Sequence, residues 1–208
     1  GHALYRKASF IPERGIINVK QSDKKSISCK TLRKQMEKVQ DEKRYEHTLG
    51  VAFTAASLAM RYGADVKQAQ VAGLLHDCAK CMTNEERLSI CKKNKLEVTP
   101  VEKANPFLLH AKVGAFLAKE KYGIQDEEIL SAVRYHTTGR PRMTLLEKIV
   151  FTADYIEPSR KTAPNLDEVR TLAFQNLDMA LCKILSDTLD YLDTVDQEID
   201  PMTKETYD

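Results

Sequence analysis

Apolar residues recur every three to four positions along most of this chain, which is the spacing that places them on one face of an α-helix. The helical pattern begins at about residue 28, and no later stretch alternates between apolar and polar residues as a strand would. We expect helices over residues 32–39, 45–62, 66–80, 84–94, 107–122, 127–136, 145–157, 166–174 and 177–196. The pattern therefore predicts an all-α domain over residues 28–208.

Several predicted helix ends carry specific capping signals. Thr83 and Glu86 have the spacing of a capping box, in which each side chain bonds the backbone N–H of the other residue. Asp65 is a typical N-cap, Gly63 is typical of the position just beyond a helix C-terminus, and Pro158 cannot continue a helix. These local signals agree with the apolar period.

The first 27 residues differ from the rest of the chain. Their short apolar clusters surround Pro12 and Gly15 and follow no sustained period. We interpret residues 1–27 as a short irregular N-terminal extension, made of a Gly1-His2 tag remnant and an arm that could include a short strand.

Composition narrows the class of protein. With 42% hydrophobic and 30% charged residues over 208 positions, the chain has the balance of a soluble globular protein. No apolar run approaches the roughly 18 residues of a membrane span, so we expect no membrane partner. The five cysteines are an odd number, which favours free thiols and a cytoplasmic location.

Charge is unevenly distributed along the chain. The net charge of +2 is too small to indicate a nucleic-acid partner. Residues 1–40 hold ten Lys or Arg against three acids, whereas residues 185–208 hold one Lys against eight acids. We interpret both ends as solvated faces of one domain. The alternative is a non-enzymatic helical binding module that uses a basic arm.

The candidate chemistry is carried by histidines and carboxylates. The predicted helical body contains four histidines: His47, His76, His110 and His136. Asp77 follows His76, and two adjacent helical residues can reach one ion only beside a helix end. Gly73 would allow another backbone to approach closely there. Asp154 lies in an otherwise apolar stretch, where a charge is costly unless it is paired or metal-bound. Imidazole plus carboxylate ligation suits iron, manganese or zinc.

The order of these residues, taken with their neighbours, resembles a known family. They lie in the segments RYEHT, AGLLHDCAK, RYHTTG and FTADYIEPSR, which begin at residues 44, 72, 134 and 151, with His110 between the second and third. Over about residues 32–200, this pattern is similar to the bacterial YqeK family of HD-domain hydrolases, the symmetrical bis(5′-nucleosyl)-tetraphosphatases.

The resemblance implies an HD-domain helical bundle that holds one or two divalent transition-metal ions, with iron as the expected metal and manganese as the alternative. The implied metal ligands are His47, His76, Asp77 and Asp154. The implied catalytic residues are Asp77, His110 and His136. The implied substrate contacts are Arg44, His47, Asp77, Lys80, His110, His136, Thr137, Asp154 and Arg160.

The reaction implied by the resemblance is metal-dependent hydrolysis of dinucleoside tetraphosphates. Metal-activated water would convert diadenosine tetraphosphate into two ADP, so the implied partner is a small-molecule nucleotide. Another nucleotide phosphohydrolase of the same type, acting on a nucleoside monophosphate or a cyclic dinucleotide, is the alternative. The leucine-rich last helix leaves two arrangements open, burial within the domain or contact in a homodimer.

Two further groups of residues allow competing interpretations. Cys78 and Cys81 have the spacing of half a structural zinc site or of a redox pair, but no second Cys-x-x-Cys is present. Arg140 and Arg142 lie in the predicted loop after His136 and could contact phosphate.

Overall fold

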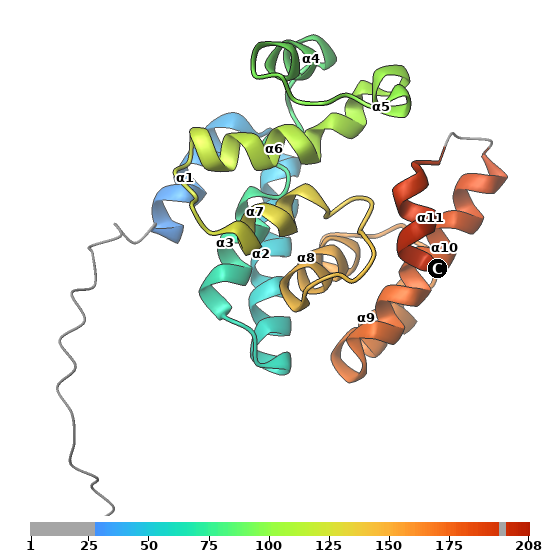
Figure 1. Cartoon of the computed structure of the whole chain (residues 1–208). Coiled ribbons are helices and arrows are strands. Elements are labelled where there is room, and N and C mark those ends of the chain that lie inside the picture. The colour runs from blue at the N-terminus through green and yellow to red at the C-terminus, as the bar shows by residue number, and fades with distance from the viewer. Residues whose placement is uncertain (1–27, 196–198) are drawn as a thin grey trace, which may run out of the picture.

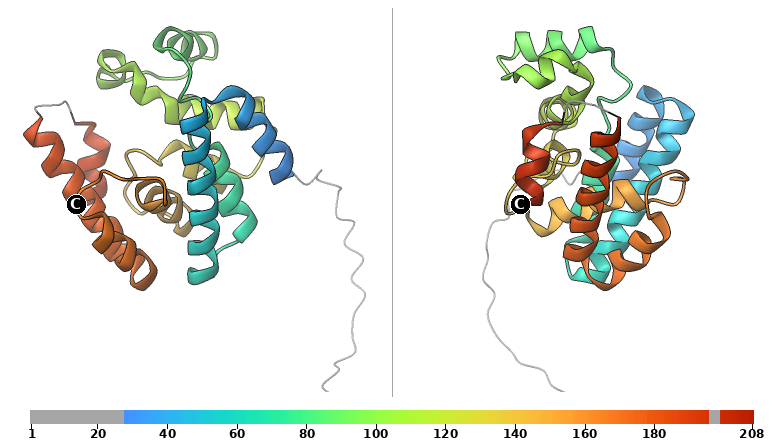
Figure 2. Two further views of the ribbon diagram at one scale, coloured as in Figure 1. Left: turned by 180° about the vertical axis from the view of Figure 1, so that it is seen from behind. Right: turned by 90° about the vertical axis from the view of Figure 1, so that its right-hand side faces the viewer.

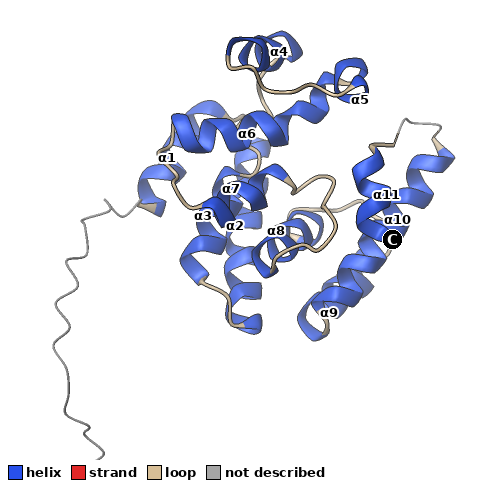
Figure 3. Ribbon diagram, viewed as in Figure 1, coloured by secondary structure: helices blue, strands red, loops and turns tan. Residues whose placement is uncertain are grey.

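The computed structural model describes residues 28–195 and 199–208, so the prediction for residues 1–27 lies outside the described residues. Within the described ranges every regular element is a helix, which confirms the all-α prediction (Figures 1 and 3). The elements are α1 (Cys29–Val39), α2 (Glu42–Tyr62), α3 (Val66–Leu75), α4 (Asn84–Lys93), α5 (Pro100–Ala104), the 3-10 helix η1 (Pro106–Leu108), α6 (Leu109–Glu120), α7 (Glu127–Arg134), α8 (Leu145–Ile156), α9 (Leu166–Gln175), α10 (Leu177–Thr194) and α11 (Pro201–Tyr207).

Helices α2, α3 and α8 pack against one another in the middle of the domain. Helix α7 contacts both α3 and α8, and α6 packs on α7. Helices α9, α10 and α11 form a group on one side, while α4 and α5 project at one end beside α6 (Figures 1 and 2). Among the described helices, none combines the length and the apolarity of a membrane-spanning segment.

The main hydrophobic core lies between these helices. Its fully buried side chains include Leu58 of α2, Leu74 of α3, Ile149 of α8 and Ile184 of α10. Burial of side chains of this size contributes about 1.5–3 kcal/mol each relative to exposure. The core therefore holds α2, α3 and α8 in one arrangement, and these three helices carry or directly precede most of the candidate site.

The predicted capping residues are found at helix ends in the structure. The Thr83 backbone N–H donates to Glu86 Oε2 at 2.7 Å, and Thr83 Oγ1 accepts from the Glu86 N–H at 3.2 Å, so the capping box is confirmed. Asp65 accepts from the backbone N–H of Gln68. Gly63 follows α2 with a φ of 72°, in the left-handed region that glycine adopts without strain.

Four helices end at least two residues earlier than the apolar pattern predicted. The helices expected over residues 107–122 and 177–196 end at Glu120 and Thr194. The helix expected over residues 66–80 ends at Leu75, and the helix expected to reach His136 ends at Arg134. The apolar pattern continues past Leu75 because residues 76–79 are buried in turns and not in a helix. The short helices α5 and α11 were not predicted, because five and seven residues are too few to show a helical period.

Gly73 determines how closely α2 and α3 approach. A Cβ atom at Gly73 would lie 2.7 Å from the Cα of Ala52, so a larger residue would push the two backbones apart. This confirms the close approach predicted at Gly73. Because His47 lies on α2 and His76 directly follows α3, the contact brings both histidines together.

Candidate metal and phosphate site

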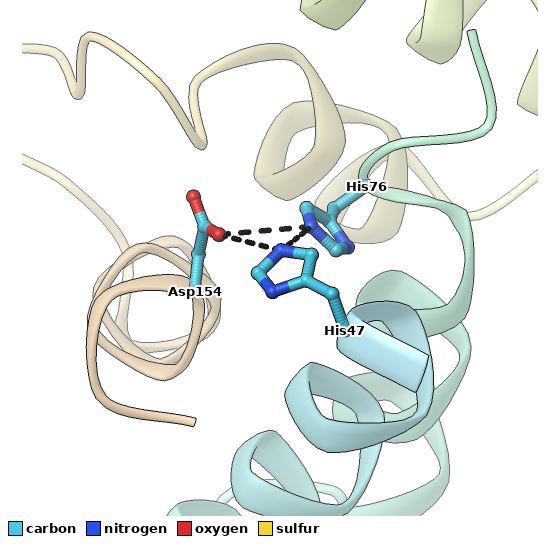
Figure 4. Close-up of side chains that lie close together, drawn as sticks. All are labelled: His47, His76 and Asp154. Atoms are coloured by element: carbon cyan, nitrogen blue, oxygen red, sulfur yellow. Dashed lines mark hydrogen bonds and ion pairs between the residues drawn. The ribbon is translucent and has the colours of Figure 1, made fainter. Parts of the chain in front are cut away.

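The six ligand-type residues meet at one place, although they come from separate elements. His47 lies on α2, His76 and Asp77 directly follow α3, His110 lies on α6, His136 follows α7 and Asp154 lies on α8. Figure 4 shows His47, His76 and Asp154 pointing toward one another from three elements. The early end of α3 allows the adjacent His76 and Asp77 to face the same cluster.

Hydrogen bonds orient each imidazole ring of this histidine cluster. In three of the rings Nδ1 donates to the carbonyl oxygen of the residue three positions earlier, at 2.7 Å in each case: Gly73 for His76, Phe107 for His110 and Val133 for His136. The Nδ1 atom of His47 donates to Glu157 Oε1 at 2.9 Å. Because Nδ1 keeps the proton of each neutral ring, Nε2 presents a lone pair to the centre of the cluster.

The first half of the cluster has the donor set of a transition-metal site. The Nε2 atoms of His47 and His76 lie 3.3 Å apart, and His47 Nε2 lies 3.0 Å from Asp154 Oδ1. Asp77 Oδ2 lies 3.4 Å from His76 Nε2 and 3.8 Å from His47 Nε2. Two imidazole nitrogens and two carboxylates in such close contact are stabilised by a shared cation. The residues present therefore fit a divalent transition metal.

The second half of the cluster adjoins the first through Asp77. Asp77 Oδ1 is buried without a hydrogen bond and lies 3.4 Å from Nε2 of both His110 and His136. These two Nε2 atoms are 3.2 Å apart. Lys80 Nζ and Thr137 Oγ1 each lie 3.3 Å from His110 Nε2. This half offers cationic and hydroxyl donors, which suit a phosphate group, and imidazole nitrogens, which suit a phosphate or a second ion.

Two arginines neutralise the carboxylates of the cluster. Arg44 Nη1 donates to Asp77 Oδ2 at 2.7 Å. Arg160 Nη2 donates to Asp154 Oδ1 at 3.1 Å and to the Asp154 carbonyl oxygen at 2.8 Å. Both guanidinium groups are partly exposed, so each has donors left over for an incoming anion.

The surroundings shift the pKa values of the cluster in different directions. Burial opposes protonation of His47, but its hydrogen bonds with Asp154 and Glu157 outweigh burial and raise its pKa to about 9. Burial, assisted by the electrostatic influence of the neighbouring His136 and Lys80, lowers the pKa of His110 to about 3. Without metal, His47 therefore holds a second proton at neutral pH, whereas His110 is neutral.

The structure brings together every residue predicted for the site. The competing cysteine interpretation gains no support: Cys78 donates to the carbonyl oxygen of Gly114, and the groups of described residues that could hold a metal contain no cysteine. Arg140 pairs with both oxygens of Glu147, which anchors its loop to the start of α8.

Two positions with a role in orienting the site were missed by the sequence prediction. Glu157 holds the ring of His47, and Gln40 Nε2 donates to the carbonyl oxygen of Asp77 at 3.2 Å. Glu157 directly precedes the helix-ending Pro158, and an acid at a buried helix end is a signal that could have identified it. Gln40 carried no such signal.

The helical fold and the histidine–carboxylate cluster define a class of protein, and comparisons with known proteins find the same class. The chain belongs to the HD-domain family, whose model matches residues 44–159, and within it to the YqeK group of hydrolases. It is 48% identical over 166 residues to the symmetrical bis(5′-nucleosyl)-tetraphosphatase of Bacillus subtilis, covering 80% of this chain and 88% of that protein. It is 40% identical over 153 residues to the protein of the same name from Staphylococcus aureus, covering 73% of this chain and 78% of that protein.

A solved structure has the same architecture. The crystal structure of a predicted HD superfamily hydrolase involved in NAD metabolism, from Clostridium acetobutylicum, matches with a TM-score of 0.83 and 39% sequence identity. The match covers 86% of this chain and 95% of that chain. The helical bundle is therefore shared over nearly the whole of that protein.

Proposed function

We propose that this protein hydrolyses dinucleoside tetraphosphates, converting diadenosine tetraphosphate into two ADP. The observation that carries the proposal is the cluster of inward-facing imidazoles and carboxylates, with cationic side chains on both sides of it. The similarity to symmetrical bis(5′-nucleosyl)-tetraphosphatases over most of the chain supports the substrate class.

We propose His47, His76, Asp77 and Asp154 as the ligands of a divalent ion, with iron preferred and manganese as the alternative. Such an ion supplies a Lewis acid that polarises a phosphoryl oxygen and makes water a better nucleophile. The remaining chemistry belongs to the chain. Glu157 holds the His47 ring so that its Nε2 faces the cluster, and Gln40 holds the backbone that carries Asp77.

The second half of the cluster is proposed to hold the phosphate chain. The Lys80 ammonium and the Thr137 hydroxyl donate to phosphate oxygens there, and Arg160, which pairs with Asp154, offers a planar fork of donors to the part of the phosphate chain beside the proposed metal. His110 and His136 line the same space, and Asp77 Oδ1 between them accepts a hydrogen bond from the attacking water. The water oxygen forms a bond to phosphorus, the bridging P–O bond breaks, and one proton is released.

We also propose a cellular location and a class of partner for this protein. The five cysteines are free, which supports a reducing cytoplasm, and the substrate is a small nucleotide and not a nucleic acid or a membrane. A homodimer through the leucine-rich last helix stays one of the two arrangements that the sequence leaves open.

A substrate panel tests the proposed function. The metal-loaded protein is assayed with diadenosine tetraphosphate, AMP and a cyclic dinucleotide, and Asp77→Ala serves as the inactive control. We expect kcat/KM to be highest for diadenosine tetraphosphate, with ADP as the sole nucleotide product. Preference for AMP or for the cyclic dinucleotide would leave a metal hydrolase but reject the substrate assignment.

A further inference from the structure

A cavity of about 780 Å³ lies beside the histidine cluster. It is walled by the first turns of α2 and by residues 157–162, which follow α8. His47 forms part of its wall, whereas Lys80, His110 and Thr137 do not line it. The cavity is therefore separate from the phosphate-binding half of the cluster, which is a group of largely buried side chains around Asp77 Oδ1. Both regions, here called the two compartments, adjoin the proposed metal ligands.

The cavity has an excess of positive charge. Its lining includes four cationic side chains, Lys43, Arg44, Arg160 and Lys161, and two carboxylates, Glu46 and Glu157. The Glu157 carboxylate already accepts three hydrogen bonds: Oε1 accepts from His47 and from the hydroxyl of Ser159, and Oε2 accepts from the Ser159 N–H. A ligand that fills this cavity is expected to be a polyvalent anion.

Asp77 shows how the two compartments are related. Its Oδ2 atom contacts Arg44, which lines the cavity, while its Oδ1 atom faces His110 and His136 in the other half of the cluster. Arg160, which also lines the cavity, contacts Asp154 of the proposed metal site. A phosphate chain that starts beside His110 and crosses the metal site therefore arrives at these two arginines and enters the cavity.

We propose that this cavity binds the leaving group of the reaction, which is the nucleoside diphosphate that does not lie beside His110 and His136. Lys43 and Lys161 contact the phosphates of this leaving group. The inference rests on the proposed function, since it assigns the two halves of a tetraphosphate to two compartments. A volume of about 780 Å³ lies within the roughly 300–1,000 Å³ typical of small-molecule pockets. Both lysines are exposed, and ammonium groups on flexible stems suit a group that must be released after the reaction.

The kinetic test compares two double variants with the same loss of charge. Lys43→Gln/Lys161→Gln removes the two cavity lysines, and Lys92→Gln/Lys93→Gln removes two exposed lysines of α4 that do not line the cavity. For the cavity variant we expect KM for diadenosine tetraphosphate to rise roughly two- to thirtyfold, the range for two solvent-exposed charge contacts, with kcat changed by less than about twofold. A rise in KM no larger than that of the α4 variant overturns the proposal.

A binding measurement tests the same proposal without catalysis. Equilibrium dialysis of the metal-loaded protein against ADP should give two bound ADP molecules per unmodified chain, and the second ADP should bind more weakly to the cavity variant than to the unmodified and α4-variant proteins. One ADP per unmodified chain contradicts a second compartment. Failure of the proposed function is a separate result, because then the unmodified protein would release no ADP from diadenosine tetraphosphate.

Discussion

Replacement of Glu157 by glutamine should weaken metal binding, although this residue is not a proposed ligand. Its carboxylate is 1% exposed and accepts three hydrogen bonds, from His47 Nδ1 at 2.9 Å and from the backbone N–H and hydroxyl of Ser159 at 2.7 Å each. An amide has one acceptor oxygen and one donor NH₂ group. In either orientation of the substituted amide, its NH₂ group faces a donor, so either the backbone of Ser159 or the ring of His47 loses its partner.

The expected loss follows from the role of such partners in metal sites. Removing a group that orients a ligating histidine typically costs 10- to 100-fold in metal affinity, or about 1.4–2.7 kcal/mol. The carboxylate also helps to raise the pKa of His47 to about 9, so in the metal-free variant that pKa should fall toward the ordinary value of 6.5. The first quantity is measured by chelator competition and the second by NMR titration.

Glu46→Gln is the matched control for this prediction. Glu46 is exposed and precedes His47 directly, so the variant makes the same chemical change beside the same ligand without touching its ring. If Glu157→Gln holds the metal as tightly as Glu46→Gln does, the hydrogen bond to His47 does not orient the ligand, and the reasoning is wrong.

Proton release, helix packing and metal retention give three more expected outcomes. The pKa of His47 is raised from 6.5 to about 9, so its protonation stabilises the metal-free fold fully below pH 6.5, and this stabilisation is lost as the pH rises through 9. Metal binding to His47 at pH 7 must therefore displace this proton. Calorimetry in buffers of different ionisation enthalpy should detect the released proton, and its absence would contradict the prediction. Gly73→Ala should lower stability by about 1–3 kcal/mol in thermal unfolding because its Cβ meets the backbone of α2, whereas Gly114→Ala, with its nearest contact at 3.5 Å, should cost less. His110→Ala and His136→Ala should each reduce turnover while elemental analysis finds the first metal retained; loss of one of two ions in either variant would show a dinuclear site.

The helices could be predicted because they depend on local patterns, whereas the membership of the site was implied by the resemblance to the YqeK family of HD-domain hydrolases. Apolar period, caps such as the Thr83 box and the glycine at position 73 indicate helices and close contacts without reference to the rest of the chain. The early end of α3 could not be read in the same way. Burial of the turn that begins at His76 continues the apolar pattern, so period alone cannot separate a buried turn from a helix.

The detailed geometry of the site depends on contacts between distant segments. The bond from His47 to Glu157 joins α2 to the residue after α8, and the bond from Gln40 to the Asp77 backbone joins the end of α1 to the turn after α3. No local spacing encodes either pair. The placement of Asp77 between two imidazole groups likewise follows from the packing of α3, α6 and α7, and could not be predicted from residue order.

Hydrolysis of diadenosine tetraphosphate by the metal-loaded protein in ¹⁸O-labelled water tests the central proposal most directly. Water is proposed to attack the second phosphorus counted from the adenosine whose phosphates lie in the phosphate-binding half of the cluster, beside Asp77. This attack predicts ADP as the only nucleotide product, with one ¹⁸O atom in one of the two ADP molecules. Chromatography and mass spectrometry should find this labelling, and Asp77→Ala should abolish it. Formation of ATP and AMP would contradict the symmetrical cut, and unchanged hydrolysis by Asp77→Ala would contradict the site itself.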